Sequence, residues 1–150
     1  GKKANKYVSQ GEWVPTELTI KLLDQELEKV NFENFILDGF PRLPDQPQKL
    51  EEMLKKHDQD IDLVLHLQVA DEVIMERRKA AWDKGESFYD QKRKDENIES
   101  IKQRLSEYHR YIEPILDYYQ EKNLLVNIDG ERPIEPIFKD IVNSIDKLSL

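Results

Sequence analysis

The chain has 150 residues, of which 36% are charged and 38% are hydrophobic, and its formal net charge at pH 7 is −8. A protein this negative is repelled by nucleic acid and by anionic membranes, so we expect neither as a partner. The absence of cysteine excludes disulfides and thiolate metal sites, and no apolar run is long enough to span a membrane. These features predict a soluble, cytoplasmic protein.

Helical and extended segments alternate along the first part of the chain. Residues 2–9 have helix-compatible spacing, and a second helix is predicted to begin at Pro15 and Thr16. Apolar residues three or four positions apart give that helix one buried stripe. The stripe consists of Ile20, Leu23, Leu27 and Val30. The apolar run 35–37 then predicts a buried strand that ends in the loop 38–42.

The remaining segments continue this alternation. A helix is predicted over 44–57, with Leu50, Met53 and Leu54 on its inner face. The later elements are, in order, a strand at 63–67, a helix at 71–82, a loop at 83–92, a helix at 95–121, a strand at 124–128 and a last helix. Pro114 should bend the longest helix, because proline removes a backbone hydrogen bond. This order predicts an α/β fold with a parallel sheet flanked by helices.

Both C-terminal helices are predicted to bury an apolar stripe. The stripe of the longer helix consists of Ile98, Ile101, Leu105, Tyr108, Ile112, Leu116 and Tyr119. The stripe of the last helix consists of Ile134, Ile137, Ile141, Ile145 and Leu148.

An aspartate and an arginine follow the predicted strand 35–37. In open parallel sheets, ligands bind beyond the carboxyl ends of the strands, which is where Asp38 and Arg42 lie. An aspartate there can organise a hydrated Mg²⁺, and an arginine can bind a phosphate through two parallel hydrogen bonds. A capped turn with a surface ion pair is the alternative interpretation.

The sign of the charge reverses between residues 77 and 94. The basic residues of this segment are Arg77, Arg78, Lys79, Lys84, Lys92, Arg93 and Lys94, and the acidic ones are Asp83, Glu86 and Asp90. A positive segment in a negative protein is a candidate polyphosphate clamp, and Gly85 would let its loop close over a ligand. Solvated helix ends explain the same composition.

Arg104 and His66 admit structural explanations as well as functional ones. Arg104 lies between Ile101 and Leu105, so we expect it at the edge of the buried face, where either an ion pair or a phosphate would neutralise it. His66 alternates with leucines inside a strand, which favours a structural histidine with satisfied hydrogen bonds. His57 and His109 show no metal-ligand spacing.

Five ordered motifs give the chain a resemblance to a known family. They are Gly11-Glu12-Trp13-Val14-Pro15-Thr16-Glu17, Phe35-Ile36-Leu37-Asp38-Gly39-Phe40-Pro41-Arg42, Val69-Ala70-Asp71-Glu72, Arg93-Lys94-Asp95-Glu96 and Asn127-Ile128-Asp129-Gly130. At this spacing they resemble the adenylate kinases and their UMP/CMP kinase relatives over essentially the whole chain. The resemblance implies the nucleoside monophosphate kinase fold and phosphoryl transfer from Mg·ATP, most simply to AMP.

The resemblance also implies roles for residues on the monophosphate side. Arg42 would bind the phosphate of AMP, and Gln46 would hydrogen-bond the adenine. Asp38 would hold the water shell of Mg²⁺, and Val14 would line the monophosphate pocket. UMP or CMP is the alternative substrate, because Gln46 alone favours AMP.

On the donor side, the resemblance places three arginines, Arg77, Arg93 and Arg104, around the phosphoryl group in transfer, where they would neutralise its charge. The backbone of Arg132 would meet the adenine of ATP. One position departs from the family: Ala81 stands where an arginine is usual, so we expect weaker electrostatics in the lid.

The expected domain organisation follows from the same resemblance. Residues 1–14 would be a remnant of the monophosphate-binding region, 15–79 and 95–150 the core, and 80–94 a short lid. Without cysteines, the zinc-binding form of the lid is excluded, so no zinc is expected.

The family's donor phosphate loop, G-x-x-G-x-G-K, does not occur in these 150 residues. In the family's strand order, 2-3-1-4-5, the chain would supply the third, fourth and fifth strands and lack the first, central one. We therefore expect further residues ahead of Gly1, or a second chain, to complete the sheet. A nucleotide-binding module without catalysis and a purely structural domain are the alternative functions.

Overall fold

The structure is a computed structural model that describes residues 14–83 and 98–148. The helix predicted at 2–9 and most of the predicted lid lie outside the described residues. The chain divides into two units, which are treated separately below. The first comprises Gly1–Ile61 and Tyr111–Tyr118, and the second comprises Asp62–Arg110 and Tyr119–Leu150.

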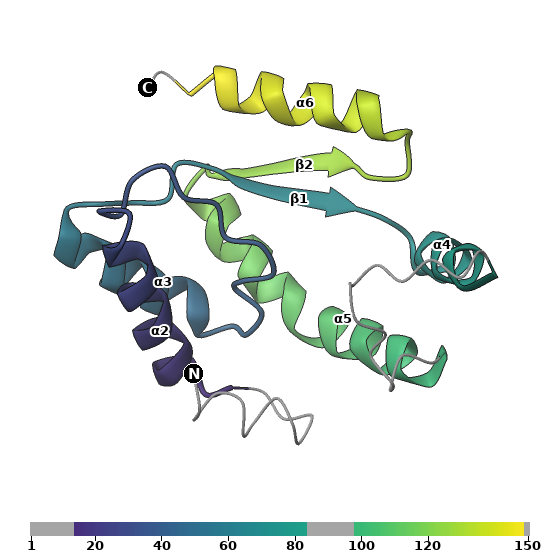
Figure 1. Cartoon of the computed structure of the whole chain (residues 1–150), viewed down its shortest axis with the longest axis horizontal. Helices are drawn as coiled ribbons and strands as arrows, with labels where there is room; N and C mark the ends of the chain where they lie inside the picture. Colours follow the sequence, from purple (N-terminus) through teal and green to yellow (C-terminus); the bar gives the residue numbers. More distant parts are fainter. Residues whose placement is uncertain (1–13, 84–97, 149–150) are drawn as a thin grey trace. The chain divides into compact units, whose positions relative to one another are not determined.

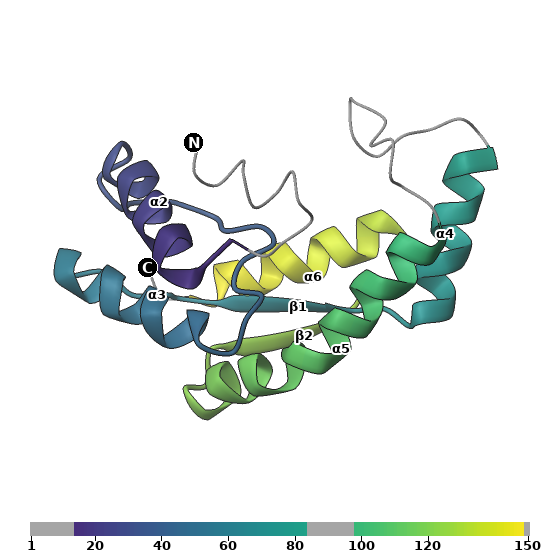
Figure 2. The same ribbon diagram turned by 90° about the horizontal axis from the view of Figure 1, so that it is seen from below.

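Two helices, α2 (Thr16–Glu28) and α3 (Gln46–Leu54), lie side by side in the first unit (Figures 1 and 2). Pro15 starts α2 and Pro47 lies in the first turn of α3, where a proline costs no helical hydrogen bond. A short 3-10 helix, Lys55–His57, continues α3. Helix α2 begins where the sequence predicts but ends before Val30, and α3 with its 3-10 extension covers most of the predicted helix 44–57.

The core of the first unit lies between these helices. Its buried residues are Leu27, Phe32, Leu50, Met53 and Leu54. The predicted inner face of α3 is therefore confirmed, and each such side chain contributes about 1.5–3 kcal/mol through burial. The prediction for Val30 was wrong, because α2 ends at Glu28 and Val30 is half exposed. The chain reverses through the left-handed residues Asn31 and Phe32, so that Phe32 enters the core instead.

Residues 35–37 do not form the predicted strand. Phe35 and Leu37 pack against the core, whereas Ile36 is 90% exposed. The segment thus alternates inward and outward like a strand, but among the described residues no strand pairs with it. A strand needs the backbone hydrogen bonds of a neighbour, and these are what the segment lacks.

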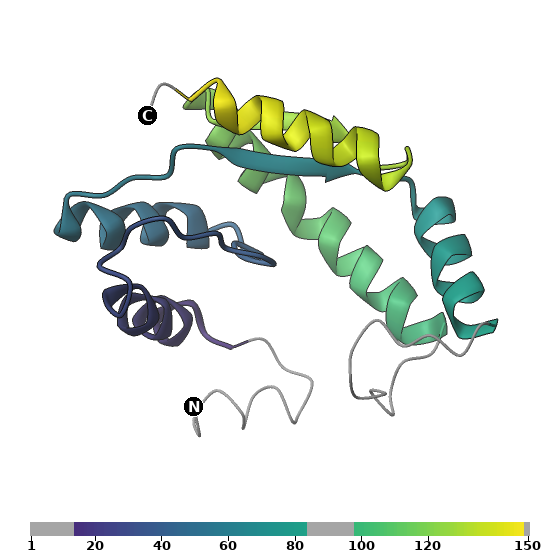
Figure 3. The ribbon, with the colours of Figure 1, turned by 45° about the horizontal axis from the view of Figure 1, so that its top comes forward.

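The second unit contains a parallel sheet of two strands, β1 (Val64–Gln68) and β2 (Leu125–Asp129). Val64 pairs with Leu125 and Gln68 with Asp129, so both strands end at the same level. Helix α4 (Asp71–Asp83) follows β1 directly, and α6 (Ile134–Asp146) follows β2 and packs along it (Figures 1 and 3). The predicted α/β fold with a parallel sheet and helices is confirmed.

The long helix α5 (Ile98–Glu121) contains Pro114 and contributes residues to both units. Its residues Ile101, Ile115 and Tyr119 are buried, whereas Ile98 is half exposed, so the predicted stripe is only partly correct. Helix α6 differs more from its prediction, which was a buried apolar stripe, because none of its residues is fully buried and Ile134 is 82% exposed. None of the described helices combines the length and apolarity needed to cross a membrane.

Candidate active site

The loop that carries Arg42 is shaped by Gly39. Gly39 adopts a φ of +75°, which side chains disfavour, and a Cβ atom there would lie 2.6 Å from Nη2 of Arg42. The Nε–H of Arg42 donates to the carbonyl oxygen of Gly39 at 2.5 Å. The arginine is exposed, but its guanidinium plane is oriented by its own loop.

Gln46 holds this loop from inside. Its side chain is 4% exposed, and its Oε1 atom accepts the backbone N–H groups of Arg42 at 2.6 Å and of Leu43 at 3.1 Å. Both lone pairs of the amide oxygen are therefore used, which fixes the orientation of the amide. What the side chain can offer a ligand is the NH₂ group, a donor.

The other two predicted residues of the first unit lie close to these in sequence. Asp38 is exposed, directly before Gly39 in the same loop. Val14 is half buried and immediately precedes Pro15, the residue that caps α2. Of the four predicted residues, Arg42 and Gln46 are the ones that hydrogen bonds bring together.

Asp38 fits the Mg²⁺ that the resemblance implies. Mg²⁺ in phosphoryl-transfer sites keeps several waters and is bound through one or two carboxylates together with substrate phosphates. The carboxylate of Asp38 is exposed and lies four positions before Arg42, the predicted phosphate ligand, which suits that arrangement. The described residues contain no group of three or more histidine or acidic side chains that would enclose a metal by themselves.

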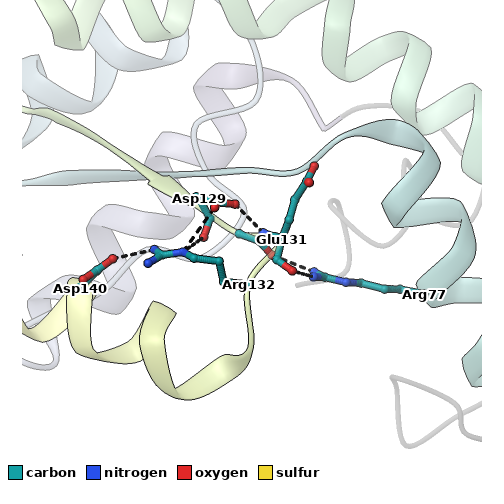
Figure 4. A network of polar contacts seen from close by, with 6 residues as sticks. Arg77, Asp129, Glu131, Arg132 and Asp140 are labelled. Atoms are coloured by element: carbon teal, nitrogen blue, oxygen red, sulfur yellow. Dashed lines mark hydrogen bonds and ion pairs between the residues drawn. The ribbon is translucent and has the colours of Figure 1, made fainter.

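In the second unit, Arg77 reaches from α4 to the turn after β2 (Figure 4). Its Nη1 and Nη2 atoms donate to the carbonyl oxygens of Gly130 and Glu131, each at 2.9 Å. These two hydrogen bonds join residues that are 53 and 54 positions apart in the sequence. The arginine predicted to bind a phosphoryl group thus also organises a turn.

Arg132 is held by two aspartates, one on each side (Figure 4). Its Nη2 atom donates to Oδ2 of Asp140 at 2.6 Å, and its Nε atom lies 3.4 Å from Oδ2 of Asp129. The hydrogen bond to Asp140 is the main reason that the pKa of Arg132 is raised above its ordinary value. With the side chain fixed against α6, the backbone of Arg132 has a defined position after the turn.

Gly130 lets the turn approach β1 closely. Its N–H donates to the carbonyl oxygen of Gln68 at 2.9 Å, and a Cβ atom would lie 2.7 Å from Cγ2 of Val69. The carboxylate of Glu131 accepts the N–H of Ala70 at 2.8 Å. Glu131 and Asp140 are not among the residues that the sequence motifs single out. Asp140 could have been paired with Arg132 across the start of α6, but nothing local marks Glu131.

Of the two other predicted arginines, Arg93 lies outside the described residues. Arg104 is exposed on α5, three positions after the buried Ile101. Ala81, the departure from the family pattern, is 7% exposed and behaves as a packed residue of α4.

His66 is the satisfied structural histidine that the sequence predicts. Its Nδ1–H donates to Oδ1 of Asn127 at 2.9 Å, and the hydroxyl of Tyr108 donates to its Nε2 atom at 2.8 Å. Burial, assisted by the charge of Asp71, raises the pKa of Tyr108, so that this hydroxyl keeps its proton. Both ring nitrogens are therefore used within the unit.

Comparison with known proteins identifies one family over most of the chain. A family model described as adenylate kinase matches residues 1–124. The adenylate kinase of Corynebacterium urealyticum is 37% identical over 148 residues, which cover 98% of the chain and 75% of that protein. Those of Azobacteroides pseudotrichonymphae and Archaeoglobus fulgidus are 36% and 33% identical, cover 99% of the chain, and are covered over 75% and 78% of their own lengths.

Proposed function

The chain belongs to the adenylate kinase family, and from that premise we propose that it acts in the reversible transfer of a phosphoryl group from Mg·ATP to AMP. The observation that carries the proposal is the loop 38–46. It presents an arginine that its own glycine orients and a buried glutamine whose amide direction is fixed.

Arg42 is the proposed ligand of the AMP phosphate. A guanidinium binds a phosphate through two parallel N–H bonds, and this requires a defined plane. The hydrogen bond from Nε of Arg42 to the carbonyl oxygen of Gly39 fixes the guanidinium plane before the ligand binds. Binding then loses less side-chain entropy, so more of the interaction contributes to affinity.

Gln46 supports AMP over UMP. Because its oxygen accepts two backbone N–H groups, the side chain has a donor for the base and no acceptor. Adenine and cytosine present a ring nitrogen that accepts, whereas the equivalent nitrogen of uracil carries a proton. CMP therefore remains the second candidate, and UMP is disfavoured.

Phosphoryl transfer needs positioning and positive charge more than covalent chemistry from the protein. Arg77 and, by resemblance, Arg93 and Arg104 are proposed to surround the phosphoryl group. Arg77 uses one N–H of each terminal nitrogen for the turn, and a guanidinium carries five such donors. Mg²⁺, when bound near Asp38, would neutralise charge on the phosphates.

We further propose that a strand from the segment carrying the donor phosphate loop completes the sheet. In the described part of the chain, β1 has a strand on one side only, and its Leu67 is 48% exposed. Helix α6, which follows β2, has no fully buried residue, and its Ile134 and Phe138 are exposed. An additional strand and helix would cover such surfaces, which otherwise destabilise the unit.

A coupled phosphotransfer assay tests this function. The chain would be assayed with Mg·ATP and AMP, CMP or UMP, alone and with a phosphate-loop segment fused ahead of Gly1. We expect turnover with AMP once the segment is present. Turnover with UMP in preference to AMP would refute the role of Gln46. No turnover with any acceptor, from a fusion shown to be folded, would favour the binding-module alternative.

A further inference from the structure

Glu131 makes three separate contacts within the second unit. Its carbonyl oxygen accepts from Arg77, and its N–H donates to Oδ1 of Asp129 at 2.9 Å (Figure 4). Its carboxylate accepts the N–H of Ala70. Gly130 also bonds to a strand end and to α4, through Gln68 and Arg77, but among the described residues of the turn Glu131 alone contacts Ala70. Among the described residues of this turn, Glu131 therefore connects the most parts.

The contact with Ala70 lies at the start of α4. The carbonyl oxygen of Ala70 accepts the N–H of Ile74, so Ala70 is the residue before the first turn of the helix. A carboxylate near a helix N-terminus is stabilised by the unpaired N–H groups there. Glu131 thus caps α4 from a position 61 residues later in the chain.

Arg77 closes the connection from the other end. It lies six positions after Asp71, the first residue of α4, and returns to the carbonyl oxygens of Gly130 and Glu131. The turn 129–132 is therefore bonded to α4 at two points, one at the helix start and one nearly two turns later. Moving the turn would disturb the position of Arg77, and moving Arg77 would disturb the turn.

We propose that Glu131 is a positioning residue for the nucleoside triphosphate, because it fixes the turn 129–132 relative to the arginine of α4. This inference rests on the proposed function, in which the backbone of Arg132 meets the adenine and Arg77 the phosphates. Glu131 itself contacts neither the adenine nor the phosphates. It sets the separation between the Arg132 backbone and Arg77, so its loss should weaken Mg·ATP binding and leave AMP binding unchanged.

Ala70 provides a matched test of the same bond from its other side. Ala70→Pro removes the N–H donor and leaves the carboxylate in place. Prolines occupy the corresponding positions before α2 and α6, at Pro15 and Pro133. Glu131→Gln keeps an oxygen that accepts the bond, and Glu135→Ala removes a comparable charge from the first turn of α6.

The experiment is a titration of the isotope-labelled chain, with the phosphate-loop segment fused ahead of Gly1, with Mg·ATP and, separately, with AMP, followed by amide resonances. We expect Glu131→Ala and Ala70→Pro each to raise the dissociation constant for Mg·ATP roughly three- to tenfold, the effect of one hydrogen bond. The variant that combines Glu131→Ala with Ala70→Pro should bind Mg·ATP no more weakly than either single variant, because both remove the same bond. Glu131→Gln and Glu135→Ala should bind like the unmodified chain.

Two outcomes would overturn the inference, and they differ from failure of the proposed function. Equal Mg·ATP affinity in Glu131→Ala, Ala70→Pro and the unmodified chain would remove Glu131 from any positioning role. An equal loss of AMP affinity would show that the bond serves general stability instead. If the unmodified chain gave no Mg·ATP response at the turn, the proposed donor site itself would be wrong, and the inference with it.

Discussion

The loop 38–46 and the turn 129–132 both present an arginine, but they are built differently. In the loop, the hydrogen bonds that join Arg42 to Gly39 and Gln46 connect residues three or four positions apart. In the turn, one bond is local, from Glu131 to Asp129, but those with Arg77 and Ala70 connect residues more than fifty positions apart. The first region can form locally, whereas the second exists only when its unit is folded.

This difference teaches where each region is vulnerable. A local loop loses its function when its own residues change, with little effect on the rest of the unit. A turn held by distant groups couples binding to the folding of the whole unit, because the same bonds serve both. The following predictions test that contrast, with activities measured in the presence of the phosphate-loop segment.

The largest effect is expected for Arg42→Ala. Removing the proposed phosphate ligand should lower kcat/KM for AMP about a thousandfold, the upper range for loss of one electrostatic contact. Because Arg42 is exposed and locally bonded, the free energy of unfolding should hardly change. Steady-state kinetics and urea denaturation measure the two quantities. Unchanged kcat/KM would take Arg42 out of the site.

Arg77→Ala should lower kcat about a hundredfold, within the range for a group that stabilises the transition state. Unlike Arg42→Ala, it should also lower the free energy of unfolding by about 1 kcal/mol, because two carbonyl groups lose their donor. Lys79→Ala, which removes another exposed cation of α4, is the control. A variant as stable as the control would contradict the coupling of the turn to α4.

Gln46→Leu should destabilise the first unit by about 2 kcal/mol, because the N–H groups of Arg42 and Leu43 would lose their acceptor. The control is Gln48→Leu, which changes an exposed glutamine two positions later in α3. Thermal and chemical denaturation measure the difference. Equal stability of the two variants would show that the amide oxygen of Gln46 does not hold the loop.

Gly39→Ala should cost about 1 kcal/mol, since alanine disfavours the φ of +75°. The added Cβ would meet only the end of the Arg42 side chain, which can move at the price of its orientation. We therefore expect KM for AMP to rise while KM for ATP stays constant. A change in KM for ATP alone would show that the loop does not bind AMP, contrary to the proposal.

The smallest effect concerns Tyr118, whose hydroxyl donates to Oε2 of Glu51 within the first unit. Burial first, and then Glu51, raise the pKa of Tyr118 to about 12 from an ordinary value of 10. Because the folded pKa is the higher one, this stabilisation is complete below pH 10 and is lost as the pH rises toward 12. Ultraviolet titration should show a tyrosine that ionises near pH 12 and is lost in Tyr118→Phe, whereas the raised pKa of Tyr108 is unaffected by that change. A Tyr118 that ionises near pH 10 would contradict this.

The two regions also differ in what the sequence reveals. Asp38, Gly39, Arg42 and Gln46 lie within nine consecutive positions, so a single motif predicts the loop and its chemistry. The structure adds that Gln46 serves the backbone with its oxygen, which a motif cannot state.

The turn and the packing surfaces were less predictable. The spacing of Asp129-Gly130 marks a turn, but Arg77 and Ala70 meet it only because β1 and β2 end at the same level. Apolar periodicity predicted α6 correctly as a helix and wrongly as a buried one, since periodicity gives the direction of a face and not its partner. For the same reason the apolar run 35–37 was predicted as a strand without evidence of a neighbour.

The central claim is that the loop 38–46 binds the monophosphate and the turn 129–132 binds the triphosphate's adenine. Amide resonances of the labelled chain, followed during separate titrations with AMP and Mg·ATP, test it most directly. We predict that AMP shifts the amides of Arg42 and Leu43, and that Mg·ATP shifts those of Gly130, Glu131 and Arg132. AMP shifts at the turn with none in the loop, or no response to either nucleotide, would contradict the account.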